Sequence, residues 1–176
     1  MSREENERSR TVKESLLDNK KILIVDDEPD VLETLSELLP MCELVEASTY
    51  EAAKQRLETE RFHMAILDIM GVDGYSLLEI ANSKKIPVVM LTAHALSVQD
   101  TVKSFKNGAA SYVPKEKITE IVTFLNDILE ARENGKSHAW RWLDRLGSYY
   151  DKKFGSDWKK HDKEFWEKLH RIQYWR

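Results

Sequence analysis

The stretch AILDIMG at positions 65–71 places one carboxylate, Asp68, after a run of apolar residues. A short apolar run that is closely followed by glycines, here Gly71 and Gly74, is typical of a buried strand that ends in a turn. In open α/β folds, ligands bind at the edge formed by the carboxyl ends of the strands. Asp68 is therefore the first candidate for a functional residue in this chain.

Three other apolar runs also end close to polar side chains that are able to act on a bound ligand. These are 22–25 with Asp26 and Asp27, 88–91 with Thr92, and 109–113 with Lys115. If the four runs belong to one parallel sheet, their carboxyl ends share an edge, and we expect these side chains to converge on Asp68.

Short apolar runs alternate with amphipathic stretches between residues 20 and 132. We predict strands over 21–25, 43–47, 64–67, 87–91 and 109–113, and helices over 29–39, 49–57, 75–81, 97–105 and 118–129. Strands that are apolar nearly throughout are buried on both faces, which indicates a parallel sheet with helices on both sides. The expected fold is α/β, doubly wound and flavodoxin-like, with the strand order 2-1-3-4-5.

The acidic pair, the strand-end Asp68, the strand-end Thr92 and the late Lys115 occur in an order that resembles the receiver domain of two-component response regulators. The resemblance covers roughly residues 20 to 132. It implies a (βα)5 domain over 20–133. Outside this domain, the polar residues 1–19 predict a flexible arm, and the amphipathic pattern of residues 134–176 predicts a helical extension. It also implies a phosphoacceptor in signalling rather than an enzyme, with at most self-phosphorylation and self-dephosphorylation.

The chemistry expected of a receiver assigns a role to each group. Asp68 accepts a phosphoryl group as a nucleophile, and Lys115 neutralises the charge that it brings. A site with one or two carboxylates suits Mg²⁺, for which Mn²⁺ is expected to substitute. We expect Asp27 and Asp68 to bind the metal directly and Asp26 to act through water. The resemblance adds the backbone carbonyl of Met70. The donor is a sensor histidine kinase, a histidine phosphotransfer protein or a small phosphodonor.

The resemblance also implies a switch. Thr92 donates its hydroxyl to the new phosphoryl group, and the aromatic side chain of Tyr112 moves into the space that Thr92 vacates. The surface that changes is formed by the helix over 97–105, the strand over 109–113 and the helix that follows. We expect this surface to make protein–protein contacts that depend on phosphorylation.

Two departures from the family pattern are visible. The loop after Asp68 is about two residues shorter than is usual in receivers, and it lacks a proline. Receivers also place a proline after the lysine, whereas here Pro114 precedes Lys115 and Glu116 follows it. A cis peptide after Lys115 is therefore not expected. Every reactive group is retained, so we expect phosphorylation to survive with altered kinetics or partner choice.

The composition changes after residue 135. Residues 20–135 hold 12 basic and 20 acidic residues, whereas residues 136–176 hold 11 basic and 6 acidic residues together with all five tryptophans. Two amphipathic stretches, over 138–150 and from 158 onward, predict a helical hairpin. The residues expected to face inward are Trp140, Leu143, Leu146 and Tyr150 in the first stretch, and Trp158, His161, Phe165, Leu169 and Ile172 in the second.

Several functions of this extension remain open at the level of sequence. It packs on the receiver, or it docks on a downstream protein or a second copy of the chain. Nucleic acid and a membrane surface are less favoured, because the lysines over 159–164 alternate with acids as on a solvated helix face. A rival function is a transcriptional regulator with a minimal DNA-binding tail. Another is a pseudo-receiver that never accepts phosphate.

A phosphatase with a strand-end aspartate nucleophile is disfavoured. Such enzymes usually place an acid two residues after the nucleophile, where this chain has Met70. No apolar run approaches the roughly 20 residues of a membrane helix, and the N-terminal residues lack the apolar core of a secretory signal. With a single cysteine as well, the expected location is the cytoplasm, with no membrane span.

Overall fold

The computed structural model describes residues 15–93, 97–135 and 139–174, and it confirms the predicted sheet. Five parallel strands pair in the order β2-β1-β3-β4-β5. They are β1 (Lys21–Val25), β2 (Glu43–Ala47), β3 (Met64–Asp68), β4 (Val88–Thr92) and β5 (Ser111–Pro114). The flavodoxin-like order therefore holds, with β2 and β5 at the two edges.

The central strands are apolar because both of their faces are covered. Every residue of β3 and β4 is buried, and so is every residue of β1 except Lys21. In the register, Val25 lies opposite Leu67, Asp68 opposite Leu91, and Thr92 opposite Pro114. The carboxyl ends of β1, β3, β4 and β5 are thereby level with one another, which brings the residues that follow them to one edge.

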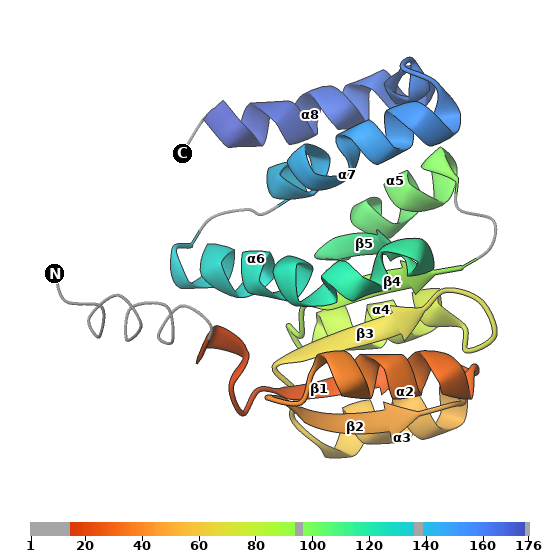
Figure 1. Ribbon diagram of the computed structural model, residues 1–176, viewed down its shortest axis with the longest axis vertical. Helices are drawn as coiled ribbons and strands as arrows, with labels where there is room; N and C mark the ends of the chain where they lie inside the picture. Colours follow the sequence, from red (N-terminus) through yellow and green to blue (C-terminus); the bar gives the residue numbers. More distant parts are fainter. Residues whose placement is uncertain (1–14, 94–96, 136–138, 175–176) are drawn as a thin grey trace, which may run out of the picture.

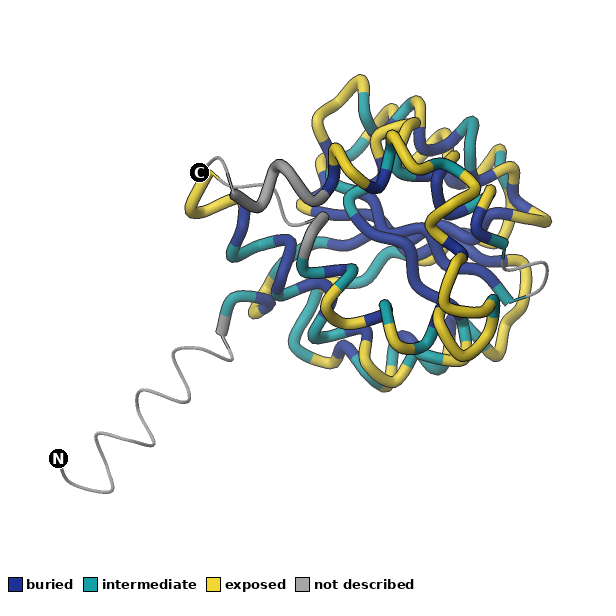
Figure 2. Tube along the Cα trace, turned by 90° about the horizontal axis from the view of Figure 1, so that it is seen from above, coloured by how far each residue is buried: buried dark blue, intermediate teal, exposed yellow. Residues whose placement is uncertain are grey.

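Helices cover both faces of the sheet. They are α2 (Pro29–Leu38), α3 (Tyr50–Thr59), α4 (Gly74–Ser83), α5 (Val98–Lys106) and α6 (Ile121–Glu133), with a 3-10 helix η2 (Lys115–Glu120) before α6. Helices α2 and α6 lie on one face, and α3, α4 and α5 lie on the other (Figure 1). Seen from above, the buried strands run through the centre and the exposed residues lie on the outer helix surfaces (Figure 2).

Most of these helices have a side-chain cap at the N-terminus. The oxygens of Thr49, Asp73 and Ser97 accept hydrogen bonds from backbone N–H groups in the first turns of α3, α4 and α5, which satisfies donors that would otherwise be unpaired. Helix α2 lacks such a cap. Glu28 occupies the cap position without a side-chain cap, and its backbone N–H donates to Asp26 Oδ1 at 2.9 Å.

The segment expected to be a flexible arm contributes to the fold where it is described. Residues 1–14 lie outside the described part of the chain. Residues Ser15–Leu17 form a 3-10 helix, η1, and Leu17 is 1% exposed within the main apolar core. A pair of leucines in a polar segment gives little sequence signal, because burial depends on the surface that each side chain meets.

The residues after 135 form the predicted hairpin at the β5 edge of the sheet, next to α5 and α6 (Figure 1). It consists of α7 (Ala139–Phe154), a 3-10 helix η3 (Trp158–Asp162) and α8 (Lys163–Tyr174). We call these three elements the tail. Among its described side chains, the fully buried ones are Trp142, Leu146, Tyr150, Trp158, Trp166 and Leu169.

The predicted inward face of the tail needs correction at single positions. Leu143 and Phe165 are half-buried, and His161 is exposed. His161 lies in η3, a 3-10 helix with fewer residues per turn than an α-helix. The inward face of the tail is therefore shifted, and Trp166 is buried instead of the expected His161. The side chains of Trp140 and Ile172 lie outside what the structure describes.

No helix within the described ranges is both long and apolar enough to cross a lipid bilayer.

Replacing Gly74 tests the packing of α4 against β3. A Cβ at Gly74 would lie 2.1 Å from the backbone oxygen of Asp68. Relieving this clash would require the backbone of α4 or β3 to move. We expect Gly74→Ala to lower the free energy of unfolding in urea by about 3 kcal/mol or more. Gly147 in α7 has no atom within 4 Å of the corresponding position. Gly147→Ala should therefore raise stability by about 0.5–1 kcal/mol, and equal effects of the two substitutions would contradict this packing.

Candidate functional site

Two buried carboxylates stand side by side at the carboxyl edge of the sheet. Asp68 is the last residue of β3 and is 5% exposed, and Asp26 directly follows β1 and is 1% exposed. Their proximity follows from the parallel pairing of β1 with β3. The sequence expectation that Asp26 and Asp68 converge is confirmed.

Lys115 brings a positive charge to these carboxylates from the end of β5. Its ammonium nitrogen lies 2.8 Å from Asp26 Oδ2, 3.0 Å from Glu28 Oε1 and 3.4 Å from Asp68 Oδ1. The side chain of Lys115 is 11% exposed, so these ion pairs are poorly screened by water. The lysine thus offsets the repulsion that would otherwise separate the carboxylates.

An open cavity of about 220 Å³ adjoins this cluster. The residues around it share the carboxyl edge of the sheet, and they are Asp27, Glu28, Asp68, Met70, Gly71, Thr92, Ala93 and Lys115. Gly71 has φ +78°, and a Cβ there would lie 2.4 Å from Asp27 Oδ2. The glycine therefore serves both the tight turn and the close approach of the acidic pair.

The remaining predicted residues divide between the cavity and the interior. Thr92 ends β4, is 4% exposed and lines the cavity. Met70 also lines it, with a side chain that is 68% exposed. Tyr112 is 0% exposed within β5, lies opposite Met90, and is not among the residues that line the cavity.

The site contains carboxyl groups that resist ionisation and an ammonium that resists deprotonation. Burial, reinforced by the charge of Asp26, raises the pKa of Asp68 from 3.8 to about 6. Burial also raises the pKa of Asp26, against the opposing effect of Lys115. For Lys115, burial lowers the pKa, but hydrogen bonds to Asp26 and Glu28 outweigh it and raise the pKa overall.

Sequence reasoning missed the role of Glu28. In the sequence it resembles an ordinary acid at the start of a helix, whereas in the structure it pairs with Lys115 and lines the cavity. Carboxylate oxygens of Asp26, Asp27 and Glu28 lie within 4.8 Å of one another. The available signal was the run of three consecutive acids after a strand.

The donors at the cavity fit a hard divalent cation. They are carboxylate oxygens, which Mg²⁺ prefers, and the open side of the cavity leaves room for the waters that Mg²⁺ retains. Asp27 is exposed beside the cavity while Asp26 and Asp68 are buried, so a cation has direct access. A further cation would also relieve the charge on four neighbouring carboxylates, which Lys115 alone does not balance.

Comparison with known families decides what kind of domain this is. The family model described as the response regulator receiver domain matches residues 22–126, which is more than half of the chain. The chain belongs to the response regulator receiver family. Apart from Lys21 at the start of β1, the matched region contains all five strands and every residue around the cavity, so the order of landmarks seen in the sequence identified the family correctly.

Relatives and solved structures agree with this assignment. The heme response regulator HssR of Staphylococcus aureus strain Newman is 35% identical over 114 residues, which cover 61% of this chain and 50% of HssR. A putative response regulator from Chloroflexus aurantiacus J-10-fl is 30% identical with a TM-score of 0.57, covering 64% of this chain and 98% of that one.

A CheY-like receiver domain protein from Methanospirillum hungatei JF-1 has a TM-score of 0.60 and 27% identity, covering 66% of this chain and 98% of that one. The chain thus spans about half the length of the curated relatives that it matches, whereas it covers nearly the whole of these single receivers. The tail lies beyond the family match.

The raised pKa of Asp68 predicts a pH-dependent stability. Because its folded-state pKa of about 6 exceeds the ordinary 3.8, the folded receiver binds more protons between these values. The resulting stability is present below about pH 4 and is lost as the pH rises through about 6. In EDTA, Asp68→Asn should therefore raise the free energy of unfolding at pH 8 by about 1–3 kcal/mol.

Urea denaturation at pH 8 and at pH 4 measures this effect, with no gain expected at pH 4. Asp30→Asn, on the exposed first turn of α2, is the matched control and should change stability little at either pH. An Asp68→Asn chain that is less stable than the parent at pH 8 would mean that the ion pair with Lys115 outweighs the burial of the carboxylate.

Proposed function

We propose that this receiver accepts a phosphoryl group on Asp68 in a Mg²⁺-dependent reaction and acts as a phosphorylation-controlled switch. The observation that carries the proposal is the arrangement at the cavity. One carboxylate, Asp68, faces both an acidic cluster suited to a cation and the ammonium of Lys115 at 3.4 Å. A nucleophile, a cation site and a fixed positive charge are what phosphoryl transfer to a carboxylate requires.

In the proposed reaction, an Asp68 carboxylate oxygen forms a bond to phosphorus while the phosphorus–nitrogen bond of a phosphohistidine breaks. The nitrogen keeps the electron pair. Asp27, Asp68 and the Met70 carbonyl would hold Mg²⁺ directly and Asp26 would hold it through water. When bound, the ion would neutralise charge between the carboxylates and the incoming phosphoryl group. Lys115 leaves its carboxylate partners in part to pair with the phosphoryl oxygens, and Thr92 donates its hydroxyl to one of them.

The departures from the family pattern leave these groups together. Glu116 stands where receivers carry a proline, and no cis peptide occurs among the described residues, yet Lys115 reaches both Asp26 and Asp68. The shortened loop after Asp68 still turns at Gly71 beside Asp27. This geometry favours a working phosphoacceptor over a pseudo-receiver.

The proposal extends to partners and to organisation. A sensor histidine kinase or a histidine phosphotransfer protein is the expected phosphodonor, since that is the relationship that defines receivers. We assign residues 20–133 to the receiver unit and 134–176 to an extension that transmits its state. A DNA-binding role for the tail is disfavoured, because its aromatic residues Trp142, Tyr150, Trp158 and Trp166 are buried.

Phosphorylation is tested directly by intact-mass spectrometry. Incubation with Mg²⁺ and phosphoramidate or acetyl phosphate should add one phosphoryl group, and the addition should disappear with EDTA or in Asp68→Asn. Asp30→Asn should be phosphorylated like the parent chain. If the parent gains no phosphoryl group either from these donors or from a histidine kinase, the pseudo-receiver interpretation is correct.

The metal site is tested by Asp27→Asn. Loss of one carboxylate charge beside the cavity should raise the Mg²⁺ concentration needed for half-maximal phosphorylation at least tenfold. The Asp30→Asn control removes the same charge three residues further along the chain and should shift it less than twofold. An unchanged Mg²⁺ requirement in Asp27→Asn would remove that residue from the metal site.

A further inference from the structure

The α5–β5–α6 face of this receiver is covered by the chain's own tail. Figure 1 shows α7 and α8 lying along the β5 edge, with α5 and α6 beneath them. The resemblance to receivers implies that this face is the surface that changes on phosphorylation. Four separate contacts, from the sheet edge, α5, η2 and α6, hold the tail there.

The first contact closes the edge of the sheet. The indole N–H of Trp142 donates to the backbone oxygen of Tyr112 at 2.6 Å. Trp142 is 2% exposed and Tyr112 is 0% exposed, so this hydrogen bond is shielded from water. An edge strand presents unpaired backbone groups on its outer side, and α7 satisfies one of them at the residue expected to switch.

The second contact joins α7 to α5. The hydroxyl groups of Thr101 and Tyr150 lie 2.6 Å apart, and both residues are 0% exposed. The ring of Tyr150 also packs against Trp142 and Trp158, with centroids 5.0 and 4.9 Å away. Thr101 Oγ1 also donates to the backbone oxygen of Ser97 at 2.8 Å, so within the pair the Tyr150 hydroxyl is the donor and Thr101 accepts.

The third contact is made by the residue that follows Lys115 in the chain. Glu116, next to Lys115, accepts hydrogen bonds from Lys153 Nζ at 2.9 Å and Tyr149 Oη at 3.0 Å. The residue that replaces the proline usual in receivers therefore binds the tail. These groups hold the pKa of Glu116 below its usual range, with Lys153 contributing most.

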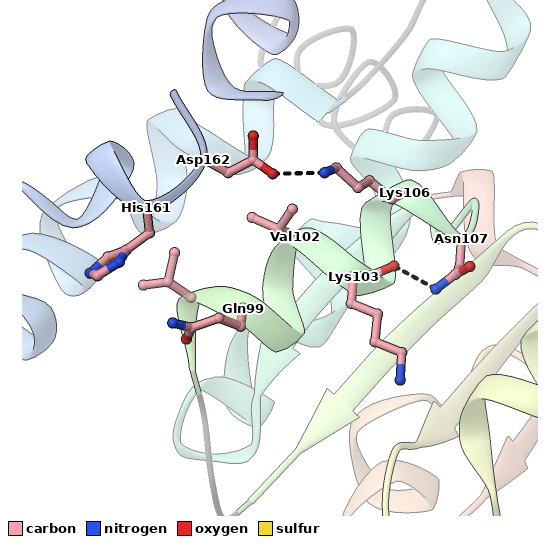
Figure 3. Close-up of a pocket in the computed structure, with 8 residues that line it drawn as sticks. Gln99, Val102, Lys103, Lys106, Asn107, His161 and Asp162 are labelled. Atoms are coloured by element: carbon pink, nitrogen blue, oxygen red, sulfur yellow. Dashed lines mark hydrogen bonds and ion pairs between the residues drawn. The ribbon is translucent and has the colours of Figure 1, made fainter. Parts of the chain in front are cut away.

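The fourth contact consists of ion pairs on either side of β5. Lys106 of α5 pairs with Asp162 of η3 at 2.7 Å, and Figure 3 shows this pair across a cavity of about 430 Å³ between the two elements. On the other side, the guanidinium of Arg145 in α7 binds the buried carboxylate of Asp127 in α6. The positive tail thus lies on a receiver that carries net negative charge.

These contacts constrain Tyr112. Tyr112 is 0% exposed, and Trp142 donates to its backbone oxygen. Thr101, which pairs with Tyr150, lies beside the Tyr112 hydroxyl. Because the docked Trp142 and Tyr150 bind to β5 and α5 beside it, Tyr112 has no exposed surface through which its ring could leave the interior. The docked tail therefore favours the inward position of Tyr112, which is the position that the receiver is expected to adopt when Asp68 is phosphorylated.

We infer that the tail is the intramolecular partner of the α5–β5–α6 face, and that its docking and the phosphorylation of Asp68 stabilise one another. The inference rests on the proposed function of Asp68. Thermodynamic coupling is reciprocal, so two consequences follow. A phosphoryl analogue at Asp68 tightens the tail, and a loosened tail weakens binding of that analogue. A second copy of the chain has no access to this face while the tail is docked.

The experiment uses the full chain with Mg²⁺ and beryllium fluoride, an analogue of the phosphoryl group. Its affinity is followed by ¹⁹F NMR, and tail docking by hydrogen exchange over 139–154. In the parent chain, the analogue should slow tail exchange at least threefold. Trp142→Ala should speed tail exchange, leave exchange of the strands unchanged, and weaken the analogue at least threefold.

Two further variants complete the test. Tyr150→Phe removes only the hydroxyl that meets Thr101, so it keeps the test decisive if Trp142→Ala disturbs the strands. It should act in the same direction with a smaller effect. Lys152→Ala, at an exposed position of α7 that makes none of the four contacts, is the matched control and should behave like the parent.

Each other outcome overturns the inference. Variants with faster tail exchange but unchanged or tighter analogue binding would show that docking is not coupled in this way, and would leave the phosphoacceptor function intact. Unchanged tail exchange in both variants would show that these contacts do not hold the tail. A parent chain that binds no analogue would remove the proposed function and the inference together.

Discussion

Repulsion among neighbouring carboxylates is the constraint on which the site depends. The parallel sheet brings Asp26 and Asp68 together at one edge, where burial makes their ionisation costly. Lys115 holds them in place with ion pairs of 2.8 and 3.4 Å. Gly71 allows the acidic pair to approach the turn after Asp68, and the start of η2 places Lys115 in contact with the carboxylates.

The sheet and most of the site were predictable from sequence for one physical reason. Strands buried on both faces must be apolar, so each strand ends visibly where a polar residue appears. The positions of Asp26, Asp68 and Thr92 follow from that boundary, and the register of the strands levels them. Lys115 was found because β5 ends at Pro114, next to it.

Other features depend on surfaces that a single sequence does not reveal. The burial of Leu17 and the choice of Trp166 rather than His161 as an inward residue are set by the neighbours that those residues meet. The amphipathic pattern showed that the tail needed a covering surface, but several surfaces satisfied it. Glu116 was recognised as a departure from its family, whereas its partners Tyr149 and Lys153 became apparent only in three dimensions.

The two edges of the sheet are protected from other chains by different means. β2 carries the charged side chains of Glu43 and Glu46, which repel an approaching strand. β5 contains no charged residue, and without α7 it would offer an apolar strand edge to any partner, including another copy of itself. The indole of Trp142 covers a backbone oxygen of this edge, and we expect a chain without the tail to be less soluble.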